Sequence, residues 1–257
     1  MRMDIQRTKH GLRLSQHGVV ISELRTRAGP THSVFDILAA LIRELTPQEG
    51  NFPNPRIGVL GFAGGGMMAP LRALGVATPR HCVDLDLDSY RLFQTHCPEW
   101  SSQILWNHQD AQSWLQRQRR RFDLLIEDLS VPQDGDVTKP SISWNSLPGC
   151  IRAKLHPDGV AIFNLLSPPT RNWKPALDST AAHFGEARII HLHDFENRIL
   201  VAGNRLPSAR ALGDGVRRRL RFMRSRQATR LHVRQLATLR LVSGLQGVQR
   251  PLKGGYC

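Results

Sequence analysis

The chain of 257 residues has no apolar run that approaches the ~20 residues of a membrane-spanning helix. Its first eighteen residues carry charges with no apolar stretch behind them, so we expect neither a secretory signal nor a membrane span. Hydrophobic residues make up 40% of the chain and charged residues 22%, which is typical of a globular protein. The length is sufficient for one sizeable core, alone or with a small appendage.

Cysteine is scarce, and the four that occur are far apart in the sequence: Cys82, Cys97, Cys150 and Cys257. They form no CxxC pair, and no histidines cluster at the spacing of a zinc site, so we expect no metal. Cys82 falls in an apolar run, where cysteine commonly acts as a small hydrophobic residue. These features predict a reducing, cytoplasmic setting.

Acidic residues are almost absent from the end of the chain. The stretch after Asn204 holds 13 of the 35 basic residues and a single acid, Asp214, whereas residues 1–204 are nearly neutral. Residues 216–246 read as a basic, partly amphipathic helix, with three arginines at helical spacing: Arg226, Arg230 and Arg234. Such a segment binds nucleic acid, another polyanion, an anionic membrane surface or an acidic partner, or forms a solvated and partly disordered extension. It lacks Tyr and Trp, which disfavours stacking on single-stranded bases.

Strand and helix patterns alternate from Arg56 onwards. The expected strands are 57–62, 81–85, 102–107, 122–128 and 159–166, followed by a tight antiparallel pair, 187–195 and 197–204. The expected helices are 66–75, 88–97, 111–119, 144–154 and 173–184. The apolar, β-branched runs are typical of strands buried on both faces by helices. The sequence therefore predicts an α/β fold, a doubly wound Rossmann-like and mostly parallel sheet closed by a C-terminal antiparallel hairpin, with a basic helical or disordered tail.

The N-terminal stretch precedes this alternation. Residues 11–29 alternate apolar and polar side chains around a glycine, which predicts a short hairpin. Ser33 is the expected N-cap of a helix that follows, and a linker rich in Pro, Gly and Asn spans 46–55. We divide the chain into a hairpin and helix (1–49), a nucleoside-binding domain (50–204) and a basic tail (205–257).

Chemically capable residues follow four successive strands. The first strand runs into a glycine-rich turn from Gly61 to Gly66, which serves either ligand approach or packing alone. Asp84 ends the second strand, where an acid can accept both hydroxyls of a ribose. Asp110 after the third strand can cap a helix, face an adenine amino group, or do both. Asp128 after the fourth strand opens into the crevice where doubly wound folds bind ligands. Together the four positions predict nucleoside binding.

These residues resemble the spermidine synthase-like (polyamine aminopropyltransferase-like) branch of the class I S-adenosylmethionine-dependent transferase fold. The resemblance covers roughly 30–204 and rests on RIGVLGFAGGG, CVDLDLDSYRLF, HQDAQSWL, FDLLIEDLSVP, SWNSLPGCIRAKLHPDGVAIFNLL and RIIHLHDFENRILVAGN. It implies S-adenosylmethionine or its decarboxylated form as cofactor. The residues implied to bind that cofactor are Gly61, Gly64, Gly65, Asp84, Leu85, Asp110 and Ala111. The resemblance also places Asp128 beside the transferred group and the attacking amine, as the catalytic residue.

The chain departs from this family in the part that holds the amine. The second Asp of the D-x-S-D-P pattern is Val131 here, and the Y-x-E-M helix has Val34, Asp36 and Ile37 at the corresponding positions. The larger N-terminal β-domain is reduced to one expected hairpin. We therefore expect classical polyamines to be poor acceptors.

Three functions remain open from the sequence. The first is a transferase that moves an aminopropyl or related group to an amine or other small nucleophile. The second is a methyltransferase on the same scaffold, although a [DN]-P-P-[YFW] turn is absent after the fourth strand. The third is a non-catalytic nucleoside-binding protein with a nucleic-acid-binding tail. A homodimer is compatible with any of them.

Overall fold

Strands and helices alternate from Ile57 as the buried β-branched runs predict. The computed structural model describes residues 4–16, 18–46, 55–133 and 135–237. Five parallel strands carry this alternation: β4 (Ile57–Leu60), β5 (Arg80–Asp84), β6 (Ile104–His108), β7 (Phe122–Glu127) and β10 (Leu155–Leu165). The helices along them are α2 (Met68–Ala73), α3 (Leu87–His96), α4 (Pro98–Ser101), α5 (Ala111–Arg117), α6 (Leu147–Lys154) and α7 (Trp173–Ala181). The predicted elements are confirmed to within a few residues at their ends.

The sheet has eight strands, in the order β13-β11-β12-β10-β7-β4-β5-β6. The predicted closing pair is confirmed as β11 (Glu186–Leu192) and β12 (Arg198–Gly203), which run antiparallel to each other. Chain order reverses between β4 and β7, because β5 lies on one side of β4 and β7 on the other. The carboxyl ends of β4 and β7 therefore border the crevice of a doubly wound sheet.

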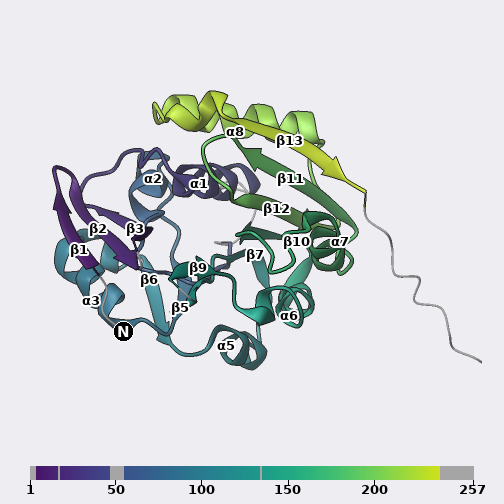
Figure 1. Cartoon of the computed structure of the whole chain (residues 1–257), viewed down its shortest axis with the longest axis horizontal. Coiled ribbons are helices and arrows are strands. Elements are labelled where there is room, and N and C mark those ends of the chain that lie inside the picture. The colour runs from purple at the N-terminus through teal and green to yellow at the C-terminus, as the bar shows by residue number, and fades with distance from the viewer. Residues whose placement is uncertain (1–3, 17, 47–54, 134, 238–257) are drawn as a thin grey trace, which may run out of the picture.

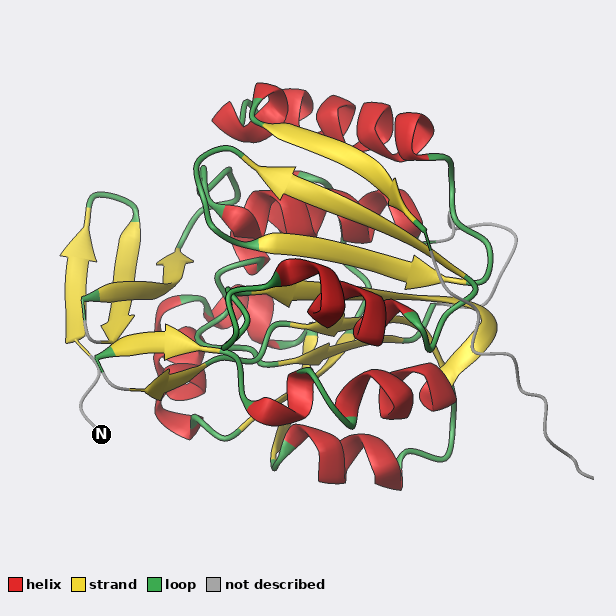
Figure 2. Cartoon of the chain, turned by 45° about the vertical axis from the view of Figure 1, so that its right-hand side comes forward, coloured by secondary structure: helices red, strands yellow, loops and turns green. Residues whose placement is uncertain are grey.

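Helices cover both faces of the sheet (Figure 2). One apolar cluster joins α1, α2, α3 and α8 to strand residues such as Val59 and Ile126. The other joins α5, α6 and α7 to the neighbouring strand residues Leu60 and Leu125. Successive strand residues point to opposite faces, so both clusters draw on the same apolar runs. This explains why those runs do not alternate with polar residues.

A separate three-stranded antiparallel sheet forms the N-terminus (Figure 1). Its strands are β1 (Asp4–Thr8), β2 (Gly11–Gln16) and β3 (Val19–Arg25), so the predicted hairpin is confirmed and gains a third strand. Helix α1 (Val34–Leu45) follows, and the Oγ of Ser33 accepts a hydrogen bond from the Phe35 amide, as expected of its N-cap. Most of the expected linker at 46–55 lies outside the described residues.

The C-terminal segment differs from the helix expected over 216–246. Helix α8 (Ala209–Phe222) ends at Phe222, the short 3₁₀ helix η2 (Arg226–Thr229) follows, and strand β13 (Leu231–Leu236) pairs with β11. The expected helix is therefore correct up to Phe222 and wrong over the strand, where Leu231 and Val233 alternate inward with a period of two. Residues 238–257 lie outside the described part of the chain.

Helix α8 lies against α1, and its buried residues Leu212, Val216 and Leu220 join the core cluster beneath it (Figure 1). Elements from 1–49, 50–204 and 205–237 thus pack together, and the division of the chain at Asn204 stays a prediction about units of folding. Within the described ranges, no helix is long and apolar enough to cross a membrane.

Candidate active site

The loops after β4 and β7 meet at the crevice through Gly61 and Asp128. The Asp128 amide donates to the Leu60 carbonyl at 2.8 Å, and the Gly61 amide donates to the Val83 carbonyl at 2.9 Å. Gly61 has a φ of 90°, and a Cβ on it would lie 2.5 Å from the carbonyl oxygen of Asp128. Glycine is therefore required here because two backbones approach closely.

Gly64 and Gly65 lie close to protein side chains. A Cβ on Gly64 would meet Leu14 of the N-terminal sheet at 2.6 Å, and one on Gly65 would meet Phe62 at 2.8 Å. Both residues are buried against protein, and the wall of the nearby cavity is formed by Gly61 and Ala63 instead. Gly64 thus packs under the N-terminal sheet and Gly65 packs against Phe62 and Phe93, while the contact of either glycine with a cofactor stays a prediction.

A cavity of about 680 Å³ lies over the carboxyl ends of β4, β5 and β7, and we call it the nucleoside cavity after the ligand that the sequence predicts. Its wall includes most of the predicted residues: Gly61, Asp84, Leu85, Asp110, Ala111 and Asp128. The Leu85 side chain is 67% exposed, which is unusual for a leucine and provides an apolar surface facing the cavity. A mostly apolar hollow with a few carboxylates suits a nucleoside.

The Asp84 carboxylate organises the glycine-rich turn. Its Oδ2 accepts the amides of Phe62 and Ala63 at 2.7 and 2.9 Å, and its Oδ1 accepts the amide of Asp86 at 3.0 Å. Each carboxylate oxygen accepts about two hydrogen bonds, so Oδ1 retains capacity for one further donor. One oxygen of Asp84 thus holds the turn, and the other keeps room for a further donor, so its contact with a ribose stays a prediction.

Two neighbouring acids act as helix caps. Asp86 accepts the amides of Asp88 and Ser89 at the start of α3, as expected for one of the acids after β5. Asp110 accepts the amide of Ser113 at 2.8 Å and caps α5, while it also borders the nucleoside cavity. The structure therefore supports capping by Asp110 and leaves its contact with adenine as a prediction.

Asp128 lies at the junction of the nucleoside cavity with a second cavity. Its Oδ1 accepts a hydrogen bond from Asn164 Nδ2 at 2.7 Å, and Asn164 Oδ1 accepts one from Asn197 at 2.9 Å. Burial raises the pKa of Asp128 to about 7, against smaller lowering effects of Lys139 and the Asn164 hydrogen bond. A carboxylate with such a pKa can take up and release a proton near neutral pH.

The second cavity, of about 630 Å³, lies between β3, α1 and the turn after β11, and we call it the acceptor cavity after the amine that the resemblance implies. The two cavities share four wall residues: Ile21, Asp128, Leu129 and Ser130. Val131, the position of the missing family Asp, borders the nucleoside cavity rather than this one. The acceptor cavity has its own carboxylates, at Asp136 and Glu196.

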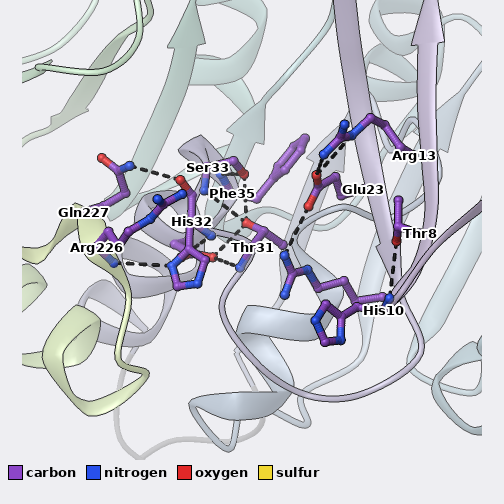
Figure 3. Close-up of polar contacts among 12 residues, drawn as sticks. Thr8, His10, Arg13, Glu23, Thr31, His32, Ser33, Phe35, Arg226 and Gln227 are labelled. Carbon is purple, nitrogen blue, oxygen red and sulfur yellow. Dashed lines mark hydrogen bonds and ion pairs between the residues drawn. The ribbon is translucent and has the colours of Figure 1, made fainter. Parts of the chain in front are cut away.

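The C-terminal segment forms one wall of the acceptor cavity. The Arg226 amide donates to His32 Nδ1 at 3.3 Å, and Gln227 Nε2 donates to the His32 carbonyl at 3.0 Å (Figure 3). Desolvation lowers the pKa of His32 below its ordinary value, which agrees with an unprotonated Nδ1 that accepts this bond. On the opposite side, Glu23 is paired with Arg13 at 3.1 Å (Figure 3).

Asp36, the residue at the Glu position of the family's helix motif, is fully buried and does not border either cavity. Its oxygens accept the amide and hydroxyl of Thr31 at 2.7 and 2.8 Å and the amide of His32 at 2.9 Å. This carboxylate therefore holds the loop before α1 in place.

Sequence reasoning missed the side chains that the turn of the β11–β12 hairpin and the C-terminal segment bring to the site. Asn164 carried a signal, since a polar residue near the end of the apolar strand β10 needs a reason, as Asp128 does after β7. Asn197 and Arg226 carried none, because only the tertiary fold brings them to the crevice. No cluster of metal-ligating side chains occurs in the described ranges.

No family model and no curated protein matches the sequence. Solved structures do match the fold: a probable spermidine synthase from Corynebacterium glutamicum has a TM-score of 0.70 at 16% identity, over 97% of this chain and 95% of that one. Spermidine synthase from Thermotoga maritima matches with a TM-score of 0.57 at 13% identity, over 80% of this chain and 69% of that one. Human Methyltransferase-like protein 13, solved in complex with SAH, matches with a TM-score of 0.56 at 16% identity, over 75% of this chain and 91% of that one. The chain thus has the α/β fold shared by spermidine synthases and this methyltransferase-like protein, as its sequence predicts.

Proposed function

We propose that this protein is an S-adenosyl-cofactor-dependent transferase that moves an aminopropyl or related alkyl group to an amine. The observation that carries the proposal is the position of Asp128, at the junction of the two cavities with a pKa near 7. A titratable carboxylate between two joined hollows suits proton removal from a nucleophile in one hollow as it attacks a ligand in the other.

The nucleoside cavity has the chemistry that an adenosyl ligand requires. The free hydrogen-bonding capacity of Asp84 Oδ1 suits a ribose hydroxyl, and the exposed Leu85 suits the apolar face of the ribose or the base. Asp110 and Ala111 border the same cavity on the side of α5 and would face the adenine. When bound, the positively charged sulfonium of the cofactor supplies an alkyl group activated for transfer.

Asp128 would act on the acceptor. An amine is protonated in neutral water, and it must lose a proton to become a nucleophile. The Asp128 carboxylate would take this proton before the attack, which frees the nitrogen lone pair to bond to the alkyl group that the cofactor would supply. Asn164 and Asn197 hold the carboxylate in place for this step through their chain of hydrogen bonds.

The acceptor cavity favours an amine over other nucleophiles because of the carboxylates around it. Asp136 lies on β9 (Asp136–Thr138) and Glu196 in the turn after β11, and both border the cavity from elements far apart in sequence. Two phenylalanines, Phe35 and Phe195, add apolar surface for the carbon chain of the acceptor. Carboxylates and aromatic rings together are suited to a cationic ligand.

Methyl transfer is the second candidate, because the methyltransferase-like protein with the same fold was solved with SAH. The structural match with the probable spermidine synthase covers nearly the whole of both chains, and for this reason we place the aminopropyl reaction first.

Product mass distinguishes these reactions. The protein would be incubated with S-adenosylmethionine or its decarboxylated form and a pool of amines, then analysed by mass spectrometry. We expect an aminopropyl gain on one amine, and a turnover about 10²–10⁴-fold lower in Asp128→Asn, the usual effect of losing a general base. A methyl gain would favour the second candidate. No product with either cofactor, despite binding of an adenosyl ligand, would indicate a non-catalytic nucleoside-binding protein.

A further inference from the structure

A buried ion pair involves the residue that precedes the proposed catalytic Asp128 in the chain. Glu127, the last residue of β7, is fully buried, and its Oε1 lies 2.7 Å from Lys139 Nζ, whose side chain is 1% exposed. Burying two charges is costly unless their partners are well placed, and an apolar pair of similar size often serves packing equally well. The reaction as proposed above uses neither residue, so the pair requires its own explanation.

The Glu127 oxygen holds both ends of one loop. In addition to its ion pair with Lys139, Glu127 Oε1 accepts hydrogen bonds from the Leu129 amide at 3.1 Å and the Ser143 hydroxyl at 3.0 Å. Leu129 and Lys139 bracket the hairpin of β8 (Val131–Gln133) and β9. A single carboxylate thus ties the start and the end of this segment to the end of β7.

The bracketed segment forms walls of both cavities. Val131 and Pro132 border the nucleoside cavity, while Asp136 and Val137 border the acceptor cavity. Any displacement of the hairpin would therefore alter both hollows at once.

The pair also acts on Asp128 electrostatically, with its two charges opposed. Lys139 lowers the pKa of Asp128 and Glu127 raises it, with Lys139 the larger effect of the two. The other groups that act on this carboxylate are Asp84 on β5, which raises its pKa, and Asn164 on β10, which lowers it by its hydrogen bond. Lys139 is the sole cation in this set.

We propose that Glu127 and Lys139 are positioning residues for Asp128: their ion pair fixes the β8–β9 hairpin over both cavities and sets the electrostatic potential at the carboxylate between them. This inference rests on the proposed function for its catalytic meaning. The protonation of Asp128 and the hydrogen exchange of the hairpin amides can be measured in a protein that turns over no substrate.

The test compares three variants by carboxyl ¹³C NMR titration of the ligand-free protein labelled at aspartate. The Asp128 signal is the one that Asp128→Asn removes. In Lys139→Met, loss of the cation should move the Asp128 titration upward by about 0.5–1 pH unit. The double variant Glu127→Gln/Lys139→Met removes both charges and should fall between Lys139→Met and the wild type. Lys174→Met, at an exposed lysine paired with Asp178, is the matched control and should change nothing.

The second readout is hydrogen exchange at the hairpin amides, which should be faster in Lys139→Met by about tenfold or more if the pair anchors the segment. Should Lys139→Met fail to fold, the double variant carries the test, because it leaves no unpaired buried charge. An unchanged Asp128 titration together with unchanged hairpin exchange would overturn the proposal and leave the pair as a packing element. In an active enzyme, the acidic limb of kcat/KM should move with the titration. Absence of activity in the wild type would count against the proposed function and leave the NMR result standing.

Discussion

Replacement of Asp128 by Asn should stabilise the protein, although it should slow the proposed transfer reaction. The ordinary pKa of 3.8 is raised to about 7 in the folded state, so the folded chain retains a proton that the unfolded chain releases between these values. A group with a raised folded pKa of this kind destabilises the fold as pH rises. The penalty is absent below about pH 4, grows between about pH 4 and 7, and is complete above about pH 7.

The size of the effect follows from the shift. Three units at about 1.4 kcal/mol each give about 4 kcal/mol. Asp128 borders two cavities open to solvent, and solvent screening reduces the effect, so we expect about 2–3 kcal/mol. Asparagine at this position carries no charge, and its side-chain oxygen can still accept the bond from Asn164 Nδ2.

Urea unfolding at pH 5 and pH 8 measures the difference. The gain in unfolding free energy of Asp128→Asn over wild type should be larger at pH 8 than at pH 5. Asp88→Asn, a carboxylate-to-amide change at a side chain that is 85% exposed, is the control. A gain that is the same at both pH values, or a loss at pH 8, would refute the raised pKa of Asp128.

Two further predictions concern the nucleoside cavity and the end of the chain. Asp84→Ala should weaken binding of S-adenosyl ligands and of methylthioadenosine by about 1.5–3 kcal/mol in calorimetry. The substitution removes a ribose acceptor and leaves the amides of Phe62 and Ala63 without their hydrogen-bond acceptor. Undiminished affinity would place the ribose elsewhere. Truncation after Asn204 should abolish a cooperative thermal transition, since it removes α8 and β13 from the core, whereas truncation after Ala237 should preserve it. A cooperative transition in the shorter chain would instead support a tail that is independent of the domain.

The parts of the fold that could be predicted are those that local pattern determines. Runs such as FDLLIE are apolar on both faces, and a parallel sheet between helices is the structure that buries both. Asp84, Asp110 and Asp128 could be assigned to one crevice because the carboxyl ends of parallel strands share one edge of a sheet.

The failures occurred where two local interpretations fit the same residues. In the segment 226–236, Arg226, Arg230 and Arg234 are spaced as on a helix, while Leu231 and Val233 are spaced as on a strand. The segment forms a strand because it pairs with the open edge of β11, and no local signal in the sequence predicts that edge. The contact of Gly64 with Leu14 could not be predicted either, because it depends on how the N-terminal sheet lies over the turn.

The contact of Gln227 with the His32 carbonyl joins residues 195 positions apart, and it closes a wall of the acceptor cavity. During synthesis, the parallel strands and the hairpin of β11 and β12 leave the ribosome well before this wall can form. Contacts of such long sequence separation form late, because the intervening chain must first be ordered. A nascent chain that already holds its sheet would therefore lack one wall of the acceptor cavity until Gln227 has left the ribosome.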